Sequence, residues 1–201
     1  MPQTSQILTS GEAESAIHSR VAALLKSKPR VLIAIDGNCC AGKTTLASHL
    51  GELLHANVFH LDDYFLQPHM RTPQRLAQPG GNVDAERFLA EVLLPASRGE
   101  TAQVQKYDCH EDVLIPPVAV LPKQVALIEG AYSLHPLLSP YYDLKIFCRI
   151  ESGLQTKRIL ARNGKDALKM FQQRWIPLEN RYFEALEILS QCDLVIDAVE
   201  S

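Results

Sequence analysis

The sequence has no long hydrophobic run and no excess of basic residues. Its longest apolar stretches have the length of a strand, far short of the roughly 20 residues that cross a bilayer. Lysine and arginine number 20 against 23 acidic residues, a net charge of −3, whereas a nucleic-acid-binding surface needs clustered basic side chains. We therefore expect neither a membrane nor a nucleic acid as partner, so local groups must hold any anionic ligand.

The five cysteines are odd in number and lack the spacing of metal ligands; they stand at positions 39, 40, 109, 148 and 192. The N-terminus lacks a charged segment followed by an apolar one, which is the pattern of a secretion signal. Both absences favour a cytoplasmic location. Whether Cys39 and Cys40 respond to oxidants stays open, because small side chains are also common where the backbone does the binding.

Strand-like and helix-like segments alternate along the chain. A helix is predicted over 12–26, and short apolar segments rich in branched residues predict strands at 31–36, 57–61, 125–129, 144–150 and 194–197. Such alternation is typical of a parallel sheet with helices on both faces. With 201 residues, 46% of them apolar, we predict a single α/β domain over 1–201, with three layers (α/β/α) and a mostly five-stranded parallel sheet.

The segment 37–44 matches the phosphate-binding pattern GxxxxGK[ST]. An apolar run precedes it, and apolar residues at helical spacing over 46–54 follow it, which is the context that the motif requires. A chance glycine-rich turn before a helix is the alternative. We predict a P-loop NTPase fold in which the following residues hold ATP: Gly37, Asn38, Cys39, Cys40, Ala41, Gly42, Lys43, Thr44 and Thr45.

Two side chains of this loop add to what its backbone offers. Backbone N–H groups at a helix N-terminus point toward bound phosphates. Lys43 would bring a mobile positive charge to the β- and γ-phosphates as a catalytic residue, and Thr44 would offer its hydroxyl to Mg²⁺. The loop therefore predicts ATP and Mg²⁺ as cofactors.

Acidic residues follow two of the predicted strands. Asp62 and Asp63 come after the strand at 57–61, and Glu129 ends the strand at 125–129; ligands of open α/β sheets bind beyond these carboxyl ends. We expect Asp62 to be a general base toward an acceptor hydroxyl or a water-mediated ligand of Mg²⁺, and Glu129 to lie beside the Mg²⁺. The alternatives are a cap for Asp63 and a structural ion pair for Glu129.

The region between these strands contains a long irregular stretch. Residues 66–83 have no period and several breakers, and such loops are usually functional; we place this one on the acceptor side. A helix is predicted from Asp84, as its N-cap, to Leu94. Residues 104–107 and 113–115 predict a small antiparallel flap outside the main sheet.

Together these residues resemble the uridine kinase-like P-loop kinases, a group that includes phosphoribulokinase and pantothenate kinase. The resemblance covers most of the chain and rests on segments 61–65, 81–84, 107–108 and 129–130, and on a short basic lid at about 158–174. It implies that Asp62 activates the acceptor hydroxyl, that Asp84 contacts sugar hydroxyls and that Tyr107 lies against a base. An N-cap is the alternative for Asp84. The implied acceptor-binding residues are Asp62, Tyr64, Asp84, Tyr107, Glu129 and Arg174.

Basic residues of the lid would neutralise the transferred phosphoryl group while water is excluded. Within this resemblance Arg158 binds the nucleotide, Arg162 is catalytic and Arg174 lies on the acceptor side. Pro177 should kink the following helix or mark its start. Apolar residues at helical spacing after the lid predict core packing without a ligand role; they are Trp175, Leu178, Tyr182, Leu186 and Leu189.

The resemblance implies an ATP-dependent phosphotransferase that moves the γ-phosphoryl group to a hydroxyl of a small metabolite, preferably a nucleoside. His110 and Lys165 depart from the pattern of the pyrimidine kinases. A pantothenate-like or sugar-phosphate acceptor therefore stays an alternative, as does a nucleotide-binding switch without kinase activity. The expected partner is a small-molecule acceptor, and a homo-oligomer is compatible with the sequence.

Overall fold

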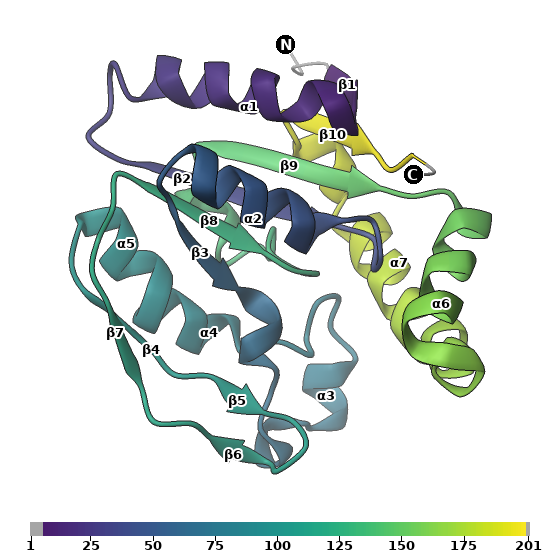
Figure 1. Ribbon diagram of the computed structural model, residues 1–201. Coiled ribbons are helices and arrows are strands. Elements are labelled where there is room, and N and C mark those ends of the chain that lie inside the picture. The colour runs from purple at the N-terminus through teal and green to yellow at the C-terminus, as the bar shows by residue number, and fades with distance from the viewer. Residues whose placement is uncertain (1–5, 200–201) are drawn as a thin grey trace.

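A parallel sheet of six strands forms the centre of the computed structural model, which describes residues 6–199 (Figure 1). Each pair of neighbouring strands runs parallel. All seven residues of β2 are buried, as expected for a strand covered on both faces. The order across the sheet is β1 (Gln6–Thr9), β10 (Leu194–Asp197), β9 (Leu144–Arg149), β2 (Val31–Gly37), β8 (Val125–Glu129) and β3 (Asn57–His60).

Helices cover both faces of this sheet. On one face, α1 (Ser10–Leu24) and α2 (Lys43–Leu53) pack against a core that includes Ile33 and Ile35 of β2. On the other, α4 (Ala85–Phe88), α5 (Leu94–Arg98) and α7 (Ile176–Ala185) lie around a core that includes Leu32 and Ala34. Alternate residues of one strand thus enter different cores, because successive side chains point to opposite faces. The predicted three-layer α/β fold is confirmed.

The sheet has one strand more than the five predicted. β1 pairs with β10 at the edge of the sheet, and its Ile7 is 61% exposed. A four-residue edge strand with one buried apolar side chain carries little periodic signal. The other strands agree with their predicted positions to within one residue.

Two π-helical turns each precede a proline. η3 (Leu89–Leu93) lies between α4 and α5, two residues before Pro95, and η5 (Phe171–Trp175) lies two residues before Pro177. Proline has no N–H group for the regular helical hydrogen bond, and a widened turn accommodates its ring. Pro177 therefore stands in the first turn of α7. This agrees with the prediction that it marks the start of the helix.

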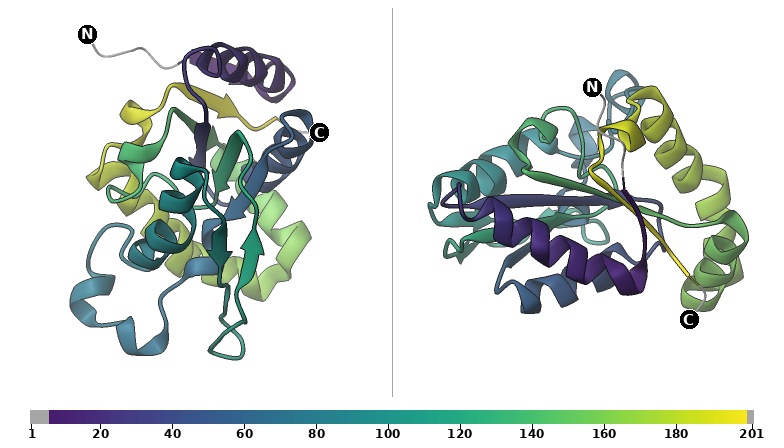
Figure 2. Two further views of the ribbon diagram at one scale, coloured as in Figure 1. Left: turned by 90° about the vertical axis from the view of Figure 1, so that its left-hand side faces the viewer. Right: turned by 90° about the horizontal axis from the view of Figure 1, so that it is seen from above.

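The lid region is helical. α6 (Ser152–Met170) continues into η5 and then α7, and Gly164 interrupts α6 with a φ of 80°. α6 and α7 stand at the end of the molecule toward which β9 runs (Figure 1, Figure 2). This end of the sheet also carries the phosphate-binding segment between β2 and α2.

The acceptor-side loop contains more local structure than predicted. A 3-10 turn η1 (Leu61–Tyr64) follows β3, and the short turns η2 (Pro68–Met70) and α3 (Pro73–Leu76) lie within residues 66–83. The flap is a ribbon of two short antiparallel pairs that projects beside this loop (Figure 2). Its strands are β4 (Ala102–Val104), β5 (Tyr107–Asp108), β6 (Val113–Leu114) and β7 (Val118–Val120).

Two further 3-10 turns complete the architecture, η4 (Ser139–Tyr141) before β9 and η6 (Ile188–Gln191) before β10. A search for membrane-crossing segments among residues 6–199 finds no helix with the length and apolar character required.

Candidate active site

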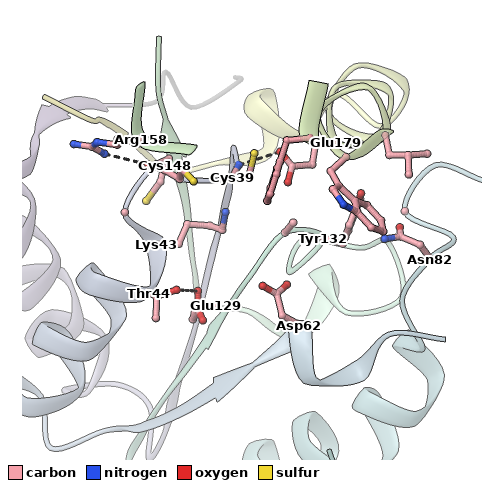
Figure 3. A pocket seen from close by; sticks show the side chains of 18 of the residues that line it. Cys39, Lys43, Thr44, Asp62, Asn82, Glu129, Tyr132, Cys148, Arg158 and Glu179 are labelled. Atoms are coloured by element: carbon pink, nitrogen blue, oxygen red, sulfur yellow. Dashed lines mark hydrogen bonds between the residues drawn. The ribbon is translucent and has the colours of Figure 1, made fainter. Parts of the chain in front are cut away.

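A cleft of about 1860 Å³ lies at the carboxyl ends of the central strands. It is larger than the roughly 300–1,000 Å³ of a typical small-ligand pocket, and it extends from the P-loop to the acceptor-side loop. Its walls come from the P-loop, the acceptor-side loop and the helices α6 and α7 (Figure 3). The predicted site residues that line it are Cys39, Cys40, Ala41, Gly42, Lys43, Thr44, Thr45, Asp62, Glu129, Arg158, Arg162 and Arg174.

The backbone of the P-loop is held in the shape that the motif predicts. Gly37 has a φ of 130°, and a Cβ atom there would lie 2.0 Å from the Cys148 carbonyl oxygen, so no other residue fits. Cys40 and Gly42 adopt φ angles of 60° and 94°; positive φ angles among helical ones turn successive N–H groups toward a common centre. α2 begins at Lys43 and adds its free N–H groups.

Gly37 and Asn38 do not line the cleft but anchor its lysine. The Lys43 ammonium donates to the carbonyl oxygens of Gly37 at 2.8 Å and of Asn38 at 2.9 Å. The Asn38 side-chain oxygen accepts from the Ile150 N–H at 3.4 Å. Lys43 is thus held across the loop by weak acceptors, which phosphate oxygens can replace with stronger, charged ones.

Thr44 and Glu129 meet at the floor of the cleft (Figure 3). The Thr44 hydroxyl donates to Glu129 Oε2 at 3.2 Å, while Glu129 Oε1 lies 2.5 Å from His60 Nδ1. Glu129 is 3% exposed. Its hydrogen bond to His60 raises the pKa of that imidazole.

These two residues fit an Mg²⁺ ion that a nucleotide would bring. A carboxylate and a hydroxyl are the hard oxygen donors that Mg²⁺ prefers, and Mg²⁺ usually uses one or two such groups together with substrate phosphates and water. Among residues 6–199, no three His, Cys, Asp or Glu side chains gather closely enough to hold a metal by themselves. The donor set therefore suits a metal that binds with phosphate.

Asp62 faces the same space from the turn that follows β3. β3 ends at His60, so Asp62 and Asp63 lie on η1 and diverge. Asp62 opens onto the cleft, and Asp63 pairs with Lys106 of the flap at 2.7 Å. Gly130 has a φ of 136°, and a Cβ atom there would lie 3.1 Å from Asp62 Oδ1, so the glycine leaves room for this carboxylate.

The cleft changes the acidity of Asp62. The surrounding walls remove much of the hydration of this carboxylate, which raises its pKa from 3.8 to about 6, and the nearby Glu129 adds to the increase while Lys43 opposes it. A carboxyl with this pKa is ionised at neutral pH and is a stronger base than an ordinary aspartate.

Asp36, which sequence reasoning did not single out, fixes the loop behind the cleft. Its fully buried carboxylate accepts from the N–H groups of Gly37 at 2.7 Å and Leu134 at 2.8 Å, and from the Tyr182 hydroxyl at 2.8 Å. Burial raises its pKa, and these donors oppose the increase. The sequence did contain a signal for Asp36, because the apolar strand predicted at 31–36 ends in this residue.

Glu179 was also missed. It is 5% exposed, lies on α7 and accepts from the Cys39 N–H at 3.0 Å (Figure 3). Gln155 of α6 donates to the Cys39 carbonyl oxygen at 3.0 Å. Burial raises the pKa of Glu179, which Lys43 opposes. Both α6, which carries most of the lid, and α7, which follows it, thus contact the P-loop, and no local sequence pattern identifies such contacts.

The three lid arginines line the cleft in different ways. Arg158 donates to the carbonyl oxygens of Cys40 at 3.1 Å and Val199 at 2.8 Å. Arg162 and Arg174 are exposed. The Arg174 guanidinium lies 4.7 Å from the centre of the Trp175 ring. The region therefore supplies one positive charge fixed to the P-loop and two at the surface of the cleft.

Trp175 and Leu178 differ from the core packing predicted for them. Both are partly buried and line the cleft. Tyr182 does lie in the core, Leu186 packs against it, and Leu189 is 40% exposed. Trp175 is the last residue of the π-helical turn η5 and Leu178 lies in the first turn of α7, so the regular helical spacing assumed for the two residues does not hold across this junction.

Three residues that the resemblance placed on the acceptor side lie outside the cleft lining. Tyr64 is buried and donates to Glu91 at 2.9 Å. Asp84 is the N-cap of α4 and accepts from the Arg87 N–H at 3.1 Å, which was its alternative role. The Tyr107 hydroxyl accepts from Arg71 at 3.0 Å. Their neighbours Phe65, Asn82 and Cys109 line the cleft in their place.

The loop cysteines are poor candidates for reactive thiolates. Burial, together with the charge of Glu179, raises the pKa of Cys39 to about 12, and burial also raises the pKa of Cys40. A thiol reacts with oxidants as its thiolate. Both side chains therefore stay protonated at neutral pH.

Comparisons with solved structures reveal the same fold in several proteins. A candidate uridine kinase from Bacillus stearothermophilus superposes with a TM-score of 0.64 at 20% identity, over 90% of this chain and 100% of that one. A candidate fructose transport system kinase from a Silicibacter species gives 0.62 at 24% identity, over 88% and 97%. A candidate P-loop kinase with a circular permutation from Saccharomyces cerevisiae gives 0.60 at 10% identity, over 96% and 100%.

The likeness is therefore one of fold. No family model and no curated protein matches the sequence. The predicted resemblance to uridine kinase-like P-loop kinases is confirmed at the level of the fold.

Proposed function

We propose that this protein is an ATP-dependent kinase that transfers the γ-phosphoryl group to a hydroxyl of a small metabolite. One observation carries the proposal: Lys43, the Thr44–Glu129 pair and Asp62 come from three elements and face one cleft (Figure 3). A phosphate-binding loop alone suits any nucleotide-binding protein. A carboxylate with a raised pKa opposite that loop suits proton removal from an acceptor.

The residues divide the reaction between them. Asp62 takes the proton of the acceptor hydroxyl as its oxygen attacks the γ-phosphorus, and the bond from that phosphorus to the bridging oxygen breaks to leave ADP. Lys43 and the lid arginines Arg158 and Arg162 neutralise charge on the phosphoryl oxygens. Thr44 and Glu129 would hold Mg²⁺, which supplies charge neutralisation between the β- and γ-phosphates when bound.

The walls of the cleft favour an acceptor with a ring. Phe65, Tyr132 and Trp175 line the same cleft as Asp62, and the Asn82 side chain lies near Tyr132 (Figure 3). Aromatic rings stack on planar ligands, and a side-chain amide can both donate hydrogen bonds to and accept them from the polar atoms at the edge of a planar ring. A nucleoside has both features, and the candidate uridine kinase shares this fold. A sugar or pantothenate-like acceptor is the alternative, since a candidate fructose transport system kinase shares it as well.

Turnover against a panel of acceptors tests the proposal. ADP formation is measured with Mg²⁺-ATP and single nucleosides, sugars, sugar phosphates or pantothenate. Acceptor-dependent ADP formation with a nucleoside supports the full proposal. Turnover with non-nucleoside acceptors alone would contradict the proposed nucleoside acceptor but would support the proposed kinase activity.

The variant Asp62→Asn separates a kinase from a nucleotide-dependent switch. As general base, Asp62 contributes a factor of about 10² to 10⁴, so the variant should lose transfer and still bind ATP. A switch relies on nucleotide binding, so Asp62→Asn should change its function little. A wild type that binds ATP but shows no acceptor-dependent turnover also favours the switch.

A further inference from the structure

His60 holds the carboxylate of Glu129 in one orientation. The two residues are register partners on the adjacent strands β3 and β8. His60 Nδ1 lies 2.5 Å from Glu129 Oε1, and the Thr44 hydroxyl contacts Glu129 Oε2 at 3.2 Å. A carboxylate only accepts hydrogen bonds, so Nδ1 carries the hydrogen of this contact. Each oxygen of Glu129 therefore has its own partner.

We propose that His60 is a positioning residue for metal binding at this site. The inference rests on the proposed function, in which Glu129 and Thr44 would hold Mg²⁺. By occupying Oε1, His60 keeps Oε2 directed toward Thr44 and the phosphate-binding loop. A partner that orients a ligating side chain commonly contributes about 10- to 100-fold to metal affinity.

The surroundings of His60 show that it acts through Glu129. His60 is not among the described residues that line the main cleft. Its ring instead borders a smaller cavity of about 510 Å³ together with Thr44, Ser48, His55 and Lys123. His60 therefore lies behind the carboxylate, away from the space that the nucleotide and the acceptor would fill, and it touches neither of them.

The contact is built into the sheet. Glu129 is buried at 3% exposure, so its carboxylate has few waters to orient it. The His60 side chain is 38% exposed, so we expect a substitution there to leave the core intact. A side chain at this position can therefore be changed with little effect on folding, which makes the contact accessible to mutation.

A pair of variants of equal shape isolates the hydrogen bond. The amide nitrogen of His60→Asn stands where Nδ1 does and can donate to Glu129, whereas His60→Leu has a similar shape without a donor. His55→Ala is the matched control, because His55 borders the same small cavity without a hydrogen bond to Glu129. Mn²⁺ binding to the ADP complex, followed by electron paramagnetic resonance, reports metal affinity without turnover.

The expected result is a loss of about tenfold or more in Mn²⁺ affinity for His60→Leu. His60→Asn and His55→Ala should stay within about threefold of the wild type, and ADP affinity without metal should not change in any variant. Equal affinities for the Leu and Asn variants would overturn the proposal, whether both are weak or both match the wild type. Glu129→Gln identifies the separate failure of the underlying site: if it binds Mn²⁺ as the wild type does, Glu129 is not a metal ligand.

Discussion

The Tyr182 hydroxyl donates to Asp36 Oδ2 at 2.8 Å and so joins helix α7 to the strand that carries the P-loop. Both side chains are fully buried. One residue of the helix that follows the lid is therefore fixed to the residue that precedes Gly37. With the hydrogen bond that Glu179 accepts from the Cys39 N–H, this bond fixes α7 as a wall of the cleft beside the P-loop.

Removing this hydroxyl should destabilise the protein. Tyr182→Phe leaves a buried carboxylate with one donor fewer, which costs about 1–3 kcal/mol. The matched control is Tyr142→Phe, because the buried Tyr142 hydroxyl has no hydrogen-bond partner among the described residues. That change should be neutral or stabilising. Urea unfolding measures both, and equal effects of the two variants would contradict the role given to the Asp36 contact.

The rate of transfer should depend on the ionisation of Asp62. Its pKa is raised to about 6, so its carboxyl is protonated below that pH and cannot accept the hydroxyl proton. We expect kcat to fall about tenfold for each pH unit below 6 and to level off above it. A steady-state pH profile measures this, and a rate that stays flat down to pH 4.5 argues against Asp62 as base.

The same shift predicts how Asp62 affects stability. A folded-state pKa above the ordinary 3.8 means that the fold favours the protonated carboxyl. The wild type should therefore lose stability relative to Asp62→Asn as the pH rises from about 4 through about 6. Urea unfolding of both proteins at pH 4 and pH 7.5 tests this. The prediction fails if their difference in free energy of unfolding is the same at both pH values.

The lid arginine Arg162 should matter for the chemical step. Arg162→Ala removes a positive charge from the cleft and should lower kcat by about 10- to 100-fold, with a smaller effect on the KM for ATP. Lys165→Ala is the control, because Lys165 is an exposed lid cation outside the cleft lining among the described residues. Similar kinetics of the two variants would show that only overall charge matters.

Glu179 should weaken nucleotide binding in the absence of metal. Its carboxylate lies against the P-loop N–H of Cys39, where phosphate would also carry negative charge. Glu179→Gln keeps an oxygen that can accept from Cys39 and removes the charge, so ATP should bind several-fold more tightly without Mg²⁺. Glu184→Gln, on the exposed face of α7, should leave affinity unchanged. Calorimetry measures both, and weaker binding by Glu179→Gln would contradict this account.

The sequence predicted those parts of the site that combine a local motif with a strand. The P-loop was recognised because its glycines and lysine stand between an apolar strand and an amphipathic helix. Asp62 and Glu129 were identified because both follow parallel strands, whose carboxyl ends meet at one edge. The direction of Asp63 was not predicted, because it depends on η1 replacing the end of β3.

Contacts between distant segments were beyond such reasoning. Glu179 and His60 meet their partners Cys39 and Glu129 only after the sheet and the lid have assembled. Trp175 was predicted to lie in the core but lines the cleft. Periodicity predicts that one face of a helix is apolar, but it does not predict whether that face packs against the core or borders a cleft. Asp84 carried two interpretations that do not exclude one another, and the structure shows the N-cap geometry, while contact with sugar hydroxyls stays a prediction.

The stoichiometry of a single turnover decides whether the protein is a kinase with Asp62 as its general base. Enzyme in excess is mixed with γ-labelled Mg²⁺-ATP and the best acceptor of the panel, and ADP, labelled acceptor and free phosphate are separated. The account predicts one labelled acceptor for each ADP in the wild type and neither product with Asp62→Asn. Formation of ADP and free phosphate at a rate independent of the acceptor, unchanged by Asp62→Asn, would contradict it.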